Sequence, residues 1–276
     1  MLQAEVYNSK CHHAWSDDMS GILVVNTPGG NTISTAELTV SHILALARNI
    51  PQATASLKQG RWDRTLYTGS ELSGKVLGVI GMGRIGKEVA QRCQGFGMTT
   101  LGYDPVLSGS ASRSYDVESV SLEELFAKSD FITIHTPLTK ETHYLIDKTS
   151  LAVCKPGVKI INCARGGIIN EADLLEAVKS GHVGGASLDT LEVEPPSKEA
   201  EELCKHPNVI MTPHLGASTI DAQVLRGDMI WKMSRVLSAL PGILSRRYLS
   251  AYLFHVYIYL YDGISPLPYP LAAPQI

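Results

Sequence analysis

Several features are scarce or absent in this sequence of 276 residues. Charged residues make up only 18% of it, and Lys plus Arg (24) nearly balance Asp plus Glu (27), which leaves a formal net charge of −3. Because no block of like charge is long enough to form a basic arm, we expect no nucleic-acid partner. The 44% of hydrophobic residues can bury a sizeable core, which excludes a disordered chain.

Cysteine is also scarce, and its five copies are scattered without a C-x-x-C pair. We therefore expect no bound metal and a cytoplasmic protein, since such usage is typical of reducing compartments. Residues 1–20 lack the apolar core of a signal peptide. The apolar run Tyr248–Tyr261 has 14 residues, fewer than the roughly twenty that a membrane-spanning helix needs, so we expect no membrane partner.

Short apolar runs alternate with segments of helical periodicity from Gly21 to about Leu240. This alternation is typical of parallel strands joined by helices and predicts an α/β fold with a doubly wound parallel sheet. Apolar runs rich in β-branched residues predict strands at Gly21–Asn26, Lys75–Ile80, Thr99–Tyr103, Phe131–Ile134, Val158–Asn162, Gly185–Leu188 and Val209–Met211.

Helix signals lie between these strands. They are the apolar periodicity of Ala36–Arg48 before Pro51, a capping-box sequence at Ser121, the segment Glu171–Lys179 before Gly181, and Ser218 or Thr219 as the cap of a long helix toward Leu240. Residues 52–73 are more polar and contain Trp62 and Tyr67. They are either an exposed arm that contacts a second copy or a surface loop with two packed rings, and the sequence leaves both open.

A glycine-rich motif, G-M-G-R-I-G, follows the expected strand Lys75–Ile80 and leads into a helical segment. Gly81 would permit a tight turn, Gly83 would let the backbone approach a pyrophosphate, and Gly86 would let the helix pack close to the strand. The next strand ends at Asp104, 23 residues after the first glycine. This context is the fingerprint of dinucleotide binding, and an acid that accepts from the ribose hydroxyls favours NAD over NADP. The alternative is a glycine-rich turn that binds no nucleotide.

Three further polar segments follow later strands, at the ends where ligands of open α/β sheets bind. They contain Arg165 in N-C-A-R-G-G, Glu192 and Glu194 in D-T-L-E-V-E-P-P, and His214 in P-H-L-G-A-S-T. Each segment alone has an ordinary structural explanation. Together they predict the oxidation of a secondary alcohol, because arginine can bind a carboxylate, imidazole can take the hydroxyl proton and a nearby carboxylate can stabilise the imidazolium.

These motifs resemble those of the D-isomer-specific 2-hydroxyacid dehydrogenase family, over about Gly21 to Leu240. The segments I-P-Q-A-T-A-S-L-K-Q-G-R-W and G-F-G-M-T-T-L-G-Y-D-P are most similar to the animal D-3-phosphoglycerate dehydrogenase branch. The resemblance implies NAD-dependent oxidation of 3-phospho-D-glycerate to 3-phosphohydroxypyruvate, the first step of phosphorylated L-serine biosynthesis. It also implies a small-molecule substrate and a homo-oligomer, a dimer, formed through the NAD-binding domain.

The resemblance also assigns roles by position. It implies that Arg165 anchors the substrate, that His214 is the general acid/base, and that Glu194 rather than Glu192 is its partner. It implies NAD contacts at Gly81, Gly83, Arg84, Ile85, Gly86, Asp104, Thr136, Cys163, Ala164, Arg165, Asp189, His214, Leu215, Gly216 and Ala217.

The chain departs from the family at both ends. Family members begin with most of a substrate-binding domain, whereas twenty unrelated residues precede Gly21. We therefore expect a non-family segment at 1–20, an NAD-binding domain at 21–240, a Tyr- and Pro-rich tail at 241–276, a largely missing substrate domain, and weak or no turnover. The other hypotheses are an inactive NAD-binding module, a glyoxylate or hydroxypyruvate reductase, and a co-repressor of the C-terminal binding protein type.

Overall fold

The computed structural model describes residues 27–106, 114–198 and 200–238. The expected strand Gly21–Asn26, the segment 1–20 and the tail 241–276 lie outside the described residues. The chain divides into two compact units, Met1–Gly227 and Asp228–Ile276. The first of these units contains the sheet and every residue that the sequence analysis assigned to a site.

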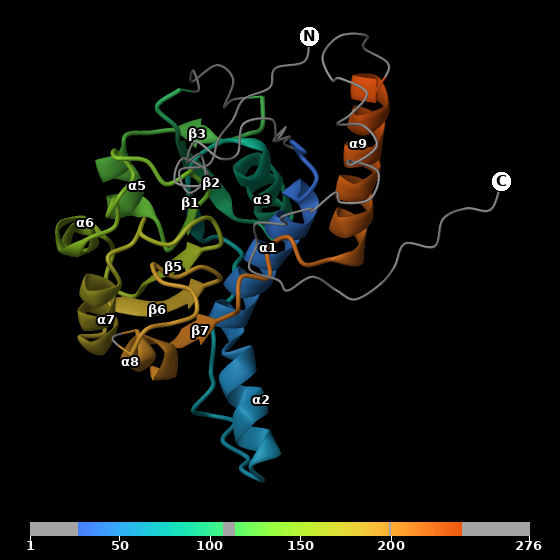
Figure 1. The fold of residues 1–276 in the computed structure, drawn as a ribbon. Coiled ribbons are helices and arrows are strands. Elements are labelled where there is room, and N and C mark those ends of the chain that lie inside the picture. Colours follow the sequence, from blue (N-terminus) through green and yellow to red (C-terminus); the bar gives the residue numbers. More distant parts are fainter. Residues whose placement is uncertain (1–26, 107–113, 199, 239–276) are drawn as a thin grey trace. The chain divides into compact units, whose positions relative to one another are not determined.

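The described part of the chain forms one sheet of seven parallel strands in the order β3-β2-β1-β4-β5-β6-β7 (Figure 1). The chain starts at the centre with β1, builds outward through β2 and β3, and then crosses to β4. The direction of winding therefore reverses between β1 and β4, which confirms the doubly wound α/β fold. The strands are β1 (Val76–Ile80), β2 (Thr99–Tyr103), β3 (Glu118–Ser119), β4 (Phe131–Ile134), β5 (Val158–Asn162), β6 (Val183–Leu188) and β7 (Val209–Met211).

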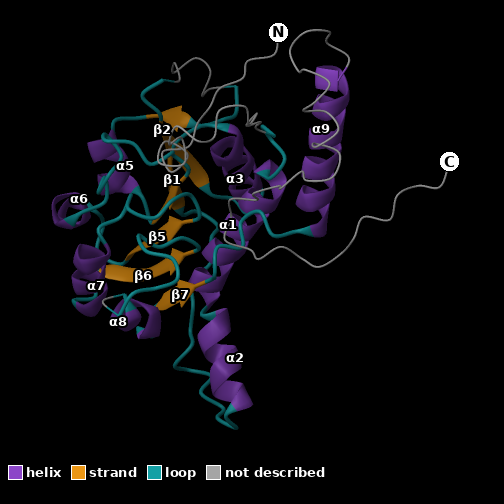
Figure 2. Cartoon of the chain, in the orientation of Figure 1, coloured by secondary structure: helices purple, strands orange, loops and turns teal. Residues whose placement is uncertain are grey.

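Helices cover both faces of this sheet (Figures 1 and 2). One face packs against α1 (Thr32–Arg48) and α3 (Arg84–Gln94). The other face packs against α5 (Leu122–Lys128) and α7 (Glu171–Lys179), with α6 (Lys148–Val153) between these two helices and α8 (Glu201–Lys205) beside β7. The described residues contain two further helices, α2 (Ile50–Lys58) and α9 (Ile220–Ser238).

Each face of the sheet buries its own apolar cluster, because successive residues of a strand point to opposite sides. Leu77 and Phe131 belong to the cluster under α1 and α3. Ile132 and Ile134 belong to the cluster under α5 and α7. These four side chains are at most 2% exposed, and burying each contributes about 1.5–3 kcal/mol. The near-continuous apolar strands of the sequence are explained by this double coverage.

The expected strands differ from the observed ones in small ways. Lys75 lies just before β1, in a turn where its N–H donates to Leu72. Strand β6 begins at Val183, two residues earlier than expected, because Val183 also pairs with Val158, and the register shifts between this pair and the next, Lys159 with Gly185. The two-residue strand β3 was missed altogether, since Glu118–Ser119 has no apolar pattern to predict it.

The segment after α1 was the largest omission. Helix α1 ends at Arg48, before Pro51 as expected, but the chain enters α2 at once with Pro51 in its first turn. Proline is tolerated there because the first N–H groups of a helix have no partner within the helix. The expected arm at residues 52–73 is therefore helical in its first part, and Figure 1 shows α2 extending away from the sheet.

Other helix signals match the structure closely. Glu171–Lys179 forms α7 with the expected bounds. Ser121 accepts a hydrogen bond from Glu124 N at the start of α5, and Thr219, rather than Ser218, accepts one from Ala222 N in the first turn of α9. No helix in the described residues is long and apolar enough to cross a membrane. The run Tyr248–Tyr261 lies outside them.

Candidate functional site

The glycine-rich motif forms the turn between β1 and α3. Gly81 has a φ of 94°, a conformation that favours glycine. A Cβ on Gly86 would lie 2.1 Å from Gly81 O, so only glycine lets α3 approach β1 this closely. A Cβ on Gly83 would meet nothing within 4 Å. The turn thus packs tightly at Gly86 and leaves open space at Gly83.

No side chain of the described residues caps the start of α3. Its N-cap is Gly83, which has no side chain to bond the first N–H groups of the helix. Arg84 is exposed at the first position, while Ile85 packs against the core. Asp104, at the end of β2, accepts hydrogen bonds from Met82 N (2.9 Å) and Val106 N (2.9 Å). An uncapped helix start, open backbone at a glycine and a carboxylate beside it fit a dinucleotide.

Thr136 follows β4, next to Gly81 across the reversal point of the sheet. Its hydroxyl oxygen is buried and has no hydrogen-bond partner among the described residues. A buried hydroxyl without a partner is costly, and a bound ligand would satisfy it. The preceding His135 lies with its Nε2 2.9 Å from Thr133 Oγ1, and burial lowers its pKa to about 3.

The segment after β5 is held by Asn162, which the sequence analysis did not single out. Asn162 Oδ1 accepts from Ala164 N (3.0 Å), and its Nδ2 donates to Arg165 O (2.8 Å). Arg165 itself is exposed, with Nη1 2.7 Å from Ala164 O. Cys163 is buried against α1, and burial raises the pKa of its thiol to about 12. A contact between Cys163 and a cofactor would therefore involve its backbone.

The segments after β5 and β6 touch each other. A Cβ on Gly166 would lie 1.8 Å from Leu191 O, so the backbone at Arg165 runs directly beside the acidic segment. Leu191 N in turn donates to Glu194 Oε1 (3.0 Å). This contact turns the carboxylate of Glu194 toward the segment that follows β7.

The structure pairs His214 with Glu194. His214 Nδ1 lies 2.9 Å from Glu194 Oε2, and the two side chains are 22% and 40% exposed. His214 has a φ of 55°, in the left-handed region. The rival Glu192 is instead 2.7 Å from the hydroxyl of Tyr144. The geometry therefore favours the preference for Glu194 over Glu192 as the partner of the histidine.

Asp189 lies beneath the His214 segment and is 1% exposed. Its carboxylate accepts hydrogen bonds from Thr212 Oγ1, from Leu215 N (2.7 Å) and from Gly216 N (2.8 Å). The sequence analysis assigned Asp189 to cofactor binding, which stays a prediction, and both of its oxygens also bond the protein itself. Asp189 therefore holds residues 212–216 in place, and Thr212 is the partner that the sequence analysis missed.

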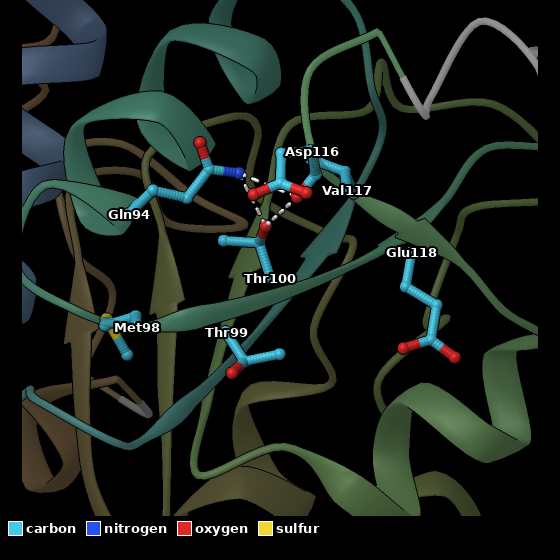
Figure 3. Close-up of a pocket in the computed structure, with 7 residues that line it drawn as sticks. All are labelled: Gln94, Met98, Thr99, Thr100, Asp116, Val117 and Glu118. Carbon is cyan, nitrogen blue, oxygen red and sulfur yellow. Dashed lines mark hydrogen bonds between the residues drawn. The ribbon is translucent and has the colours of Figure 1, made fainter.

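A hollow of about 430 Å³ lies elsewhere on the domain, at the amino ends of β2 and β3 (Figure 3). Gln94 Nε2 donates to Thr100 Oγ1 (2.8 Å) and to Asp116 O (2.9 Å) in its wall. Its acidic lining by Asp116 and Glu118 does not suit a phosphate. Within the described residues, no group of three or more His, Cys, Asp or Glu side chains could hold a metal ion.

The assigned residues instead follow one edge of the sheet. They come after β2, β1, β4, β5, β6 and β7, which are neighbours in that order. At about 4.8 Å per strand, this edge is roughly 24 Å long from Asp104 to His214. The reversal point between β1 and β4, where ligands of such sheets bind, lies within it.

Comparison with known proteins agrees with this geometry. Residues 40–216 match the family model described as the NAD binding domain of D-isomer specific 2-hydroxyacid dehydrogenase. The D-lactate dehydrogenase of Aquifex aeolicus, whose structure is a complex with NAD and lactic acid, superposes with a TM-score of 0.71 and 31% identity over 79% of this chain and 70% of that one. A glyoxylate reductase from Paecilomyes thermophila superposes with a TM-score of 0.69 and 31% identity over 76% of this chain and 62% of that chain.

Curated relatives are more similar still. The D-3-phosphoglycerate dehydrogenases of Sus scrofa and Bacillus subtilis are 54% and 55% identical over 210 and 204 residues. These alignments cover 76% and 74% of this chain but 39% and 38% of the relatives, so the chain spans about two fifths of their length. The animal and bacterial identities are nearly equal. The chain belongs to the D-isomer specific 2-hydroxyacid dehydrogenase family and carries that family's NAD-binding domain.

Proposed function

We propose that the chain is the NAD-binding part of a D-3-phosphoglycerate dehydrogenase, which oxidises 3-phospho-D-glycerate to 3-phosphohydroxypyruvate in the first step of phosphorylated L-serine biosynthesis. The observation that carries this proposal is the contact of His214 with Glu194. This contact lies at the carboxyl ends of the strands, the same edge of the sheet that carries the dinucleotide fingerprint. Identities of 50–55% to D-3-phosphoglycerate dehydrogenases, against 31% to the glyoxylate reductase, support this substrate over glyoxylate.

The dinucleotide would lie along the carboxyl ends of the strands. Its pyrophosphate would lie at the start of α3 at Gly83 and Arg84, and its adenosine ribose would lie at Asp104. The nicotinamide end would then lie near Ala164 and residues 214–217. When bound, NAD supplies the acceptor for a hydride.

His214 would act as the base. Because Nδ1 faces the carboxylate of Glu194, Nδ1 carries the ring proton and Nε2 keeps a lone pair. Nε2 would take the proton of the substrate C2 hydroxyl as the hydride leaves C2 for the cofactor, and Glu194 would stabilise the resulting imidazolium. The exposed guanidinium of Arg165 would hold the substrate carboxylate with two parallel hydrogen bonds.

Calorimetric titration with NAD tests the cofactor site. We expect the chain to bind NAD, and Asp104→Ala to weaken binding about tenfold through the loss of charge-assisted hydrogen bonds. Asp116→Asn, in the hollow at the opposite end of the strands, is the matched control and should leave the affinity unchanged. A wild-type chain that does not bind NAD would contradict the cofactor site.

An assay of NADH formation with 3-phosphoglycerate tests the activity. We expect slow turnover, which His214→Asn lowers by about a hundredfold or more, the range for a general base. NAD binding without NADH formation would instead support an inactive NAD-binding module. Faster reduction of glyoxylate or hydroxypyruvate would favour the reductase hypothesis, and no observation here specifically favours a co-repressor.

We further propose that the chain forms a homo-oligomer, as a dimer, through residues 50–68. Exposed apolar side chains gather there, with Leu57 56%, Trp62 81% and Leu66 70% exposed. Ser56 and Arg61 both contact Asp63, at 2.8 Å and 3.1 Å, which holds the turn after α2 in shape. A cytoplasmic location is supported by the thiols of the described residues, which are free.

A further inference from the structure

A buried histidine connects α1 to the segment that carries His214. His42 is 4% exposed on the inner face of α1. Its Nδ1 lies 2.7 Å from Ser187 Oγ in β6, and its Nε2 lies 3.3 Å from Thr212 Oγ1 just after β7. Thr212 in turn bonds Asp189. The imidazole therefore bridges three elements that the sequence places far apart.

The direction of each hydrogen bond follows from the number of protons available. Asp189 is a carboxylate that accepts two backbone N–H groups, so the single hydroxyl proton of Thr212 is donated to it. Thr212 Oγ1 must then accept from His42, which places the ring proton on Nε2. Nδ1 is left as the acceptor for the hydroxyl of Ser187. With a neutral imidazole, each side chain in the series Ser187, His42, Thr212 and Asp189 has a hydrogen-bond partner.

A second contact from α1 holds the other end of the same segment. Thr35 Oγ1 donates to Gly216 O (3.1 Å), while Gly216 N donates to Asp189 Oδ2. Thr35 and His42 are seven residues apart, and residues at this spacing lie on one face of a helix. Helix α1 thus bonds the segment at both of its ends, with His214 between them.

We propose that His42 is a positioning residue, which acts through Thr212 and Asp189 to fix residues 212–216 and with them the imidazole of His214. The functional part of this inference rests on the proposed function, because the fixed segment is the one assigned to the nicotinamide end of NAD. His42 does not contact that end itself. Its role is to keep Thr212 oriented so that the Asp189 carboxylate remains available to Leu215 N and Gly216 N.

The charges around His42 are consistent with this role. Burial lowers the pKa of His42, and the negative charge of Asp189 raises it in part. The nearby thiol of Cys163, 4.0 Å from Nδ1, stays protonated because burial raises its pKa. The ring is therefore neutral near pH 7, the form that the hydrogen-bond chain requires.

The first test compares NAD with ADP-ribose, which lacks the nicotinamide. We expect His42→Leu to raise the Kd for NAD about tenfold, since loss of a buried hydrogen bond at this site loosens the segment, and to change the Kd for ADP-ribose less than about twofold. His42→Gln keeps an N–H donor and should restore much of the affinity. Thr39→Val is the matched control, because Thr39 is buried on α1 and its hydroxyl donates to Thr35 O in its own helix.

A role confined to core packing predicts a different result. His42→Leu would then weaken NAD and ADP-ribose equally, in proportion to its loss of thermal stability, and Thr39→Val would behave the same way. Either of these outcomes, or unchanged NAD affinity in a folded His42→Leu variant, would overturn the proposal.

Amide hydrogen exchange gives a test that needs no ligand. In His42→Leu we expect faster exchange at Leu215 and Gly216, whose N–H groups bond Asp189, with unchanged exchange in β1 and β4. Equal protection of these two amides in wild type and variant would contradict the inference even if the chain bound no NAD. Failure of NAD binding in the wild type would contradict the proposed function alone.

Discussion

At the residue scale, two glutamates separated by one position have different partners. Glu194 contacts His214, whereas Glu192 accepts a hydrogen bond from the hydroxyl of Tyr144. The hydrogen bond from Leu191 N to Glu194 explains the difference, because it turns that carboxylate back over its own loop. Nothing in the composition of the acidic segment distinguishes the two side chains, but the backbone does.

The first prediction concerns these two glutamates. Glu194→Gln should lower kcat for 3-phosphoglycerate oxidation by about 10- to 100-fold, because a neutral amide stabilises the imidazolium of His214 poorly. Glu192→Gln is the matched control and should change kcat by less than about threefold. Steady-state rates of NADH formation measure both, and a larger loss in Glu192→Gln would reverse the assignment.

At the element scale, the contact between β1 and α3 depends on a pair of glycines in different surroundings. Gly86 faces the carbonyl oxygen of Gly81, so the helix is as close to the strand as a backbone allows. Gly83 faces open space one turn earlier. The lack of a side chain at Gly86 therefore permits close packing, whereas the lack of a side chain at Gly83 leaves room for a ligand.

The second prediction separates these two effects. Gly86→Ala should lower the free energy of unfolding by about 1–3 kcal/mol, the usual cost of overpacking, because its methyl group forces α3 away from β1. Gly83→Ala should leave stability within about 0.5 kcal/mol but weaken NAD binding. Urea denaturation and NAD titration of both variants measure this, and equal destabilisation by the two alanines would contradict it.

The third prediction concerns pH and two histidines, the buried His42 of α1 and the half-buried His135 after β4. Burial lowers the pKa of both His42 and His135, so each is neutral in the folded protein but binds a proton when unfolded below about pH 6.5. Their contribution to stability is therefore complete above that pH and is lost as the pH falls. As the pH falls below about 6.5, protonation of each histidine in the unfolded chain should lower the free energy of unfolding by up to about 1.4 kcal/mol per pH unit.

Urea denaturation at pH 7.5 and 5.5 measures this dependence. His42→Leu should reduce the difference in the free energy of unfolding between the two pH values. His143→Gln, which removes an exposed histidine, is the comparison variant and should leave this difference unchanged. A difference that persists in full in His42→Leu would show that His42 is protonated in the fold.

At the scale of the whole molecule, the largest exposed apolar side chains of residues 50–68 lie at a distance from the site. Trp62 is 81% exposed, which is uncommon for tryptophan in a monomer. Aromatic and aliphatic side chains gathered on one exposed segment are typical of an interface between subunits.

The fourth prediction tests this interface. Wild type should sediment as a dimer, and Trp62→Ser with Leu66→Ser should shift it to a monomer that keeps its NAD affinity, because neither residue lies on the carboxyl edge of the sheet. Analytical ultracentrifugation measures the mass. Ile33→Ser, an exposed apolar position of α1, is the control; a wild-type monomer would contradict the proposal.

Much of the fold could be predicted from the sequence, because a parallel sheet buried on both faces leaves long apolar runs at regular intervals. Strands β4 and β5 have the expected bounds for this reason. The short polar strand β3 carries no such pattern, and α2 was hidden by the usual effect of Pro51 as a helix boundary.

The site was predictable where chemistry and chain position coincide. His214 and Arg165 follow strand ends, so the sequence places them on one edge. His42 could not be found in this way, because it lies within a helix rather than after a strand and its partner Thr212 is 170 positions away. Contacts of that span depend on the packed fold rather than on any local pattern.

The order of the strands also bears on how the binding site forms during folding. Its groups come from six adjacent strands, and the last of these, β7, can pair only after β6 is in place. Pairings between segments distant in the chain form late, since closing long loops costs entropy before contacts compensate. The pairing of β1 with β4, which joins Leu77 to Phe131, spans more of the chain than the pairing of β6 with β7, which joins Ala186 to Val209. A fragment that ends before β7 would retain the glycine-rich turn without His214. Recovery of NAD affinity during refolding should therefore wait for the pairing of β1 with β4, and the ligand would report that the two halves of the sheet have joined.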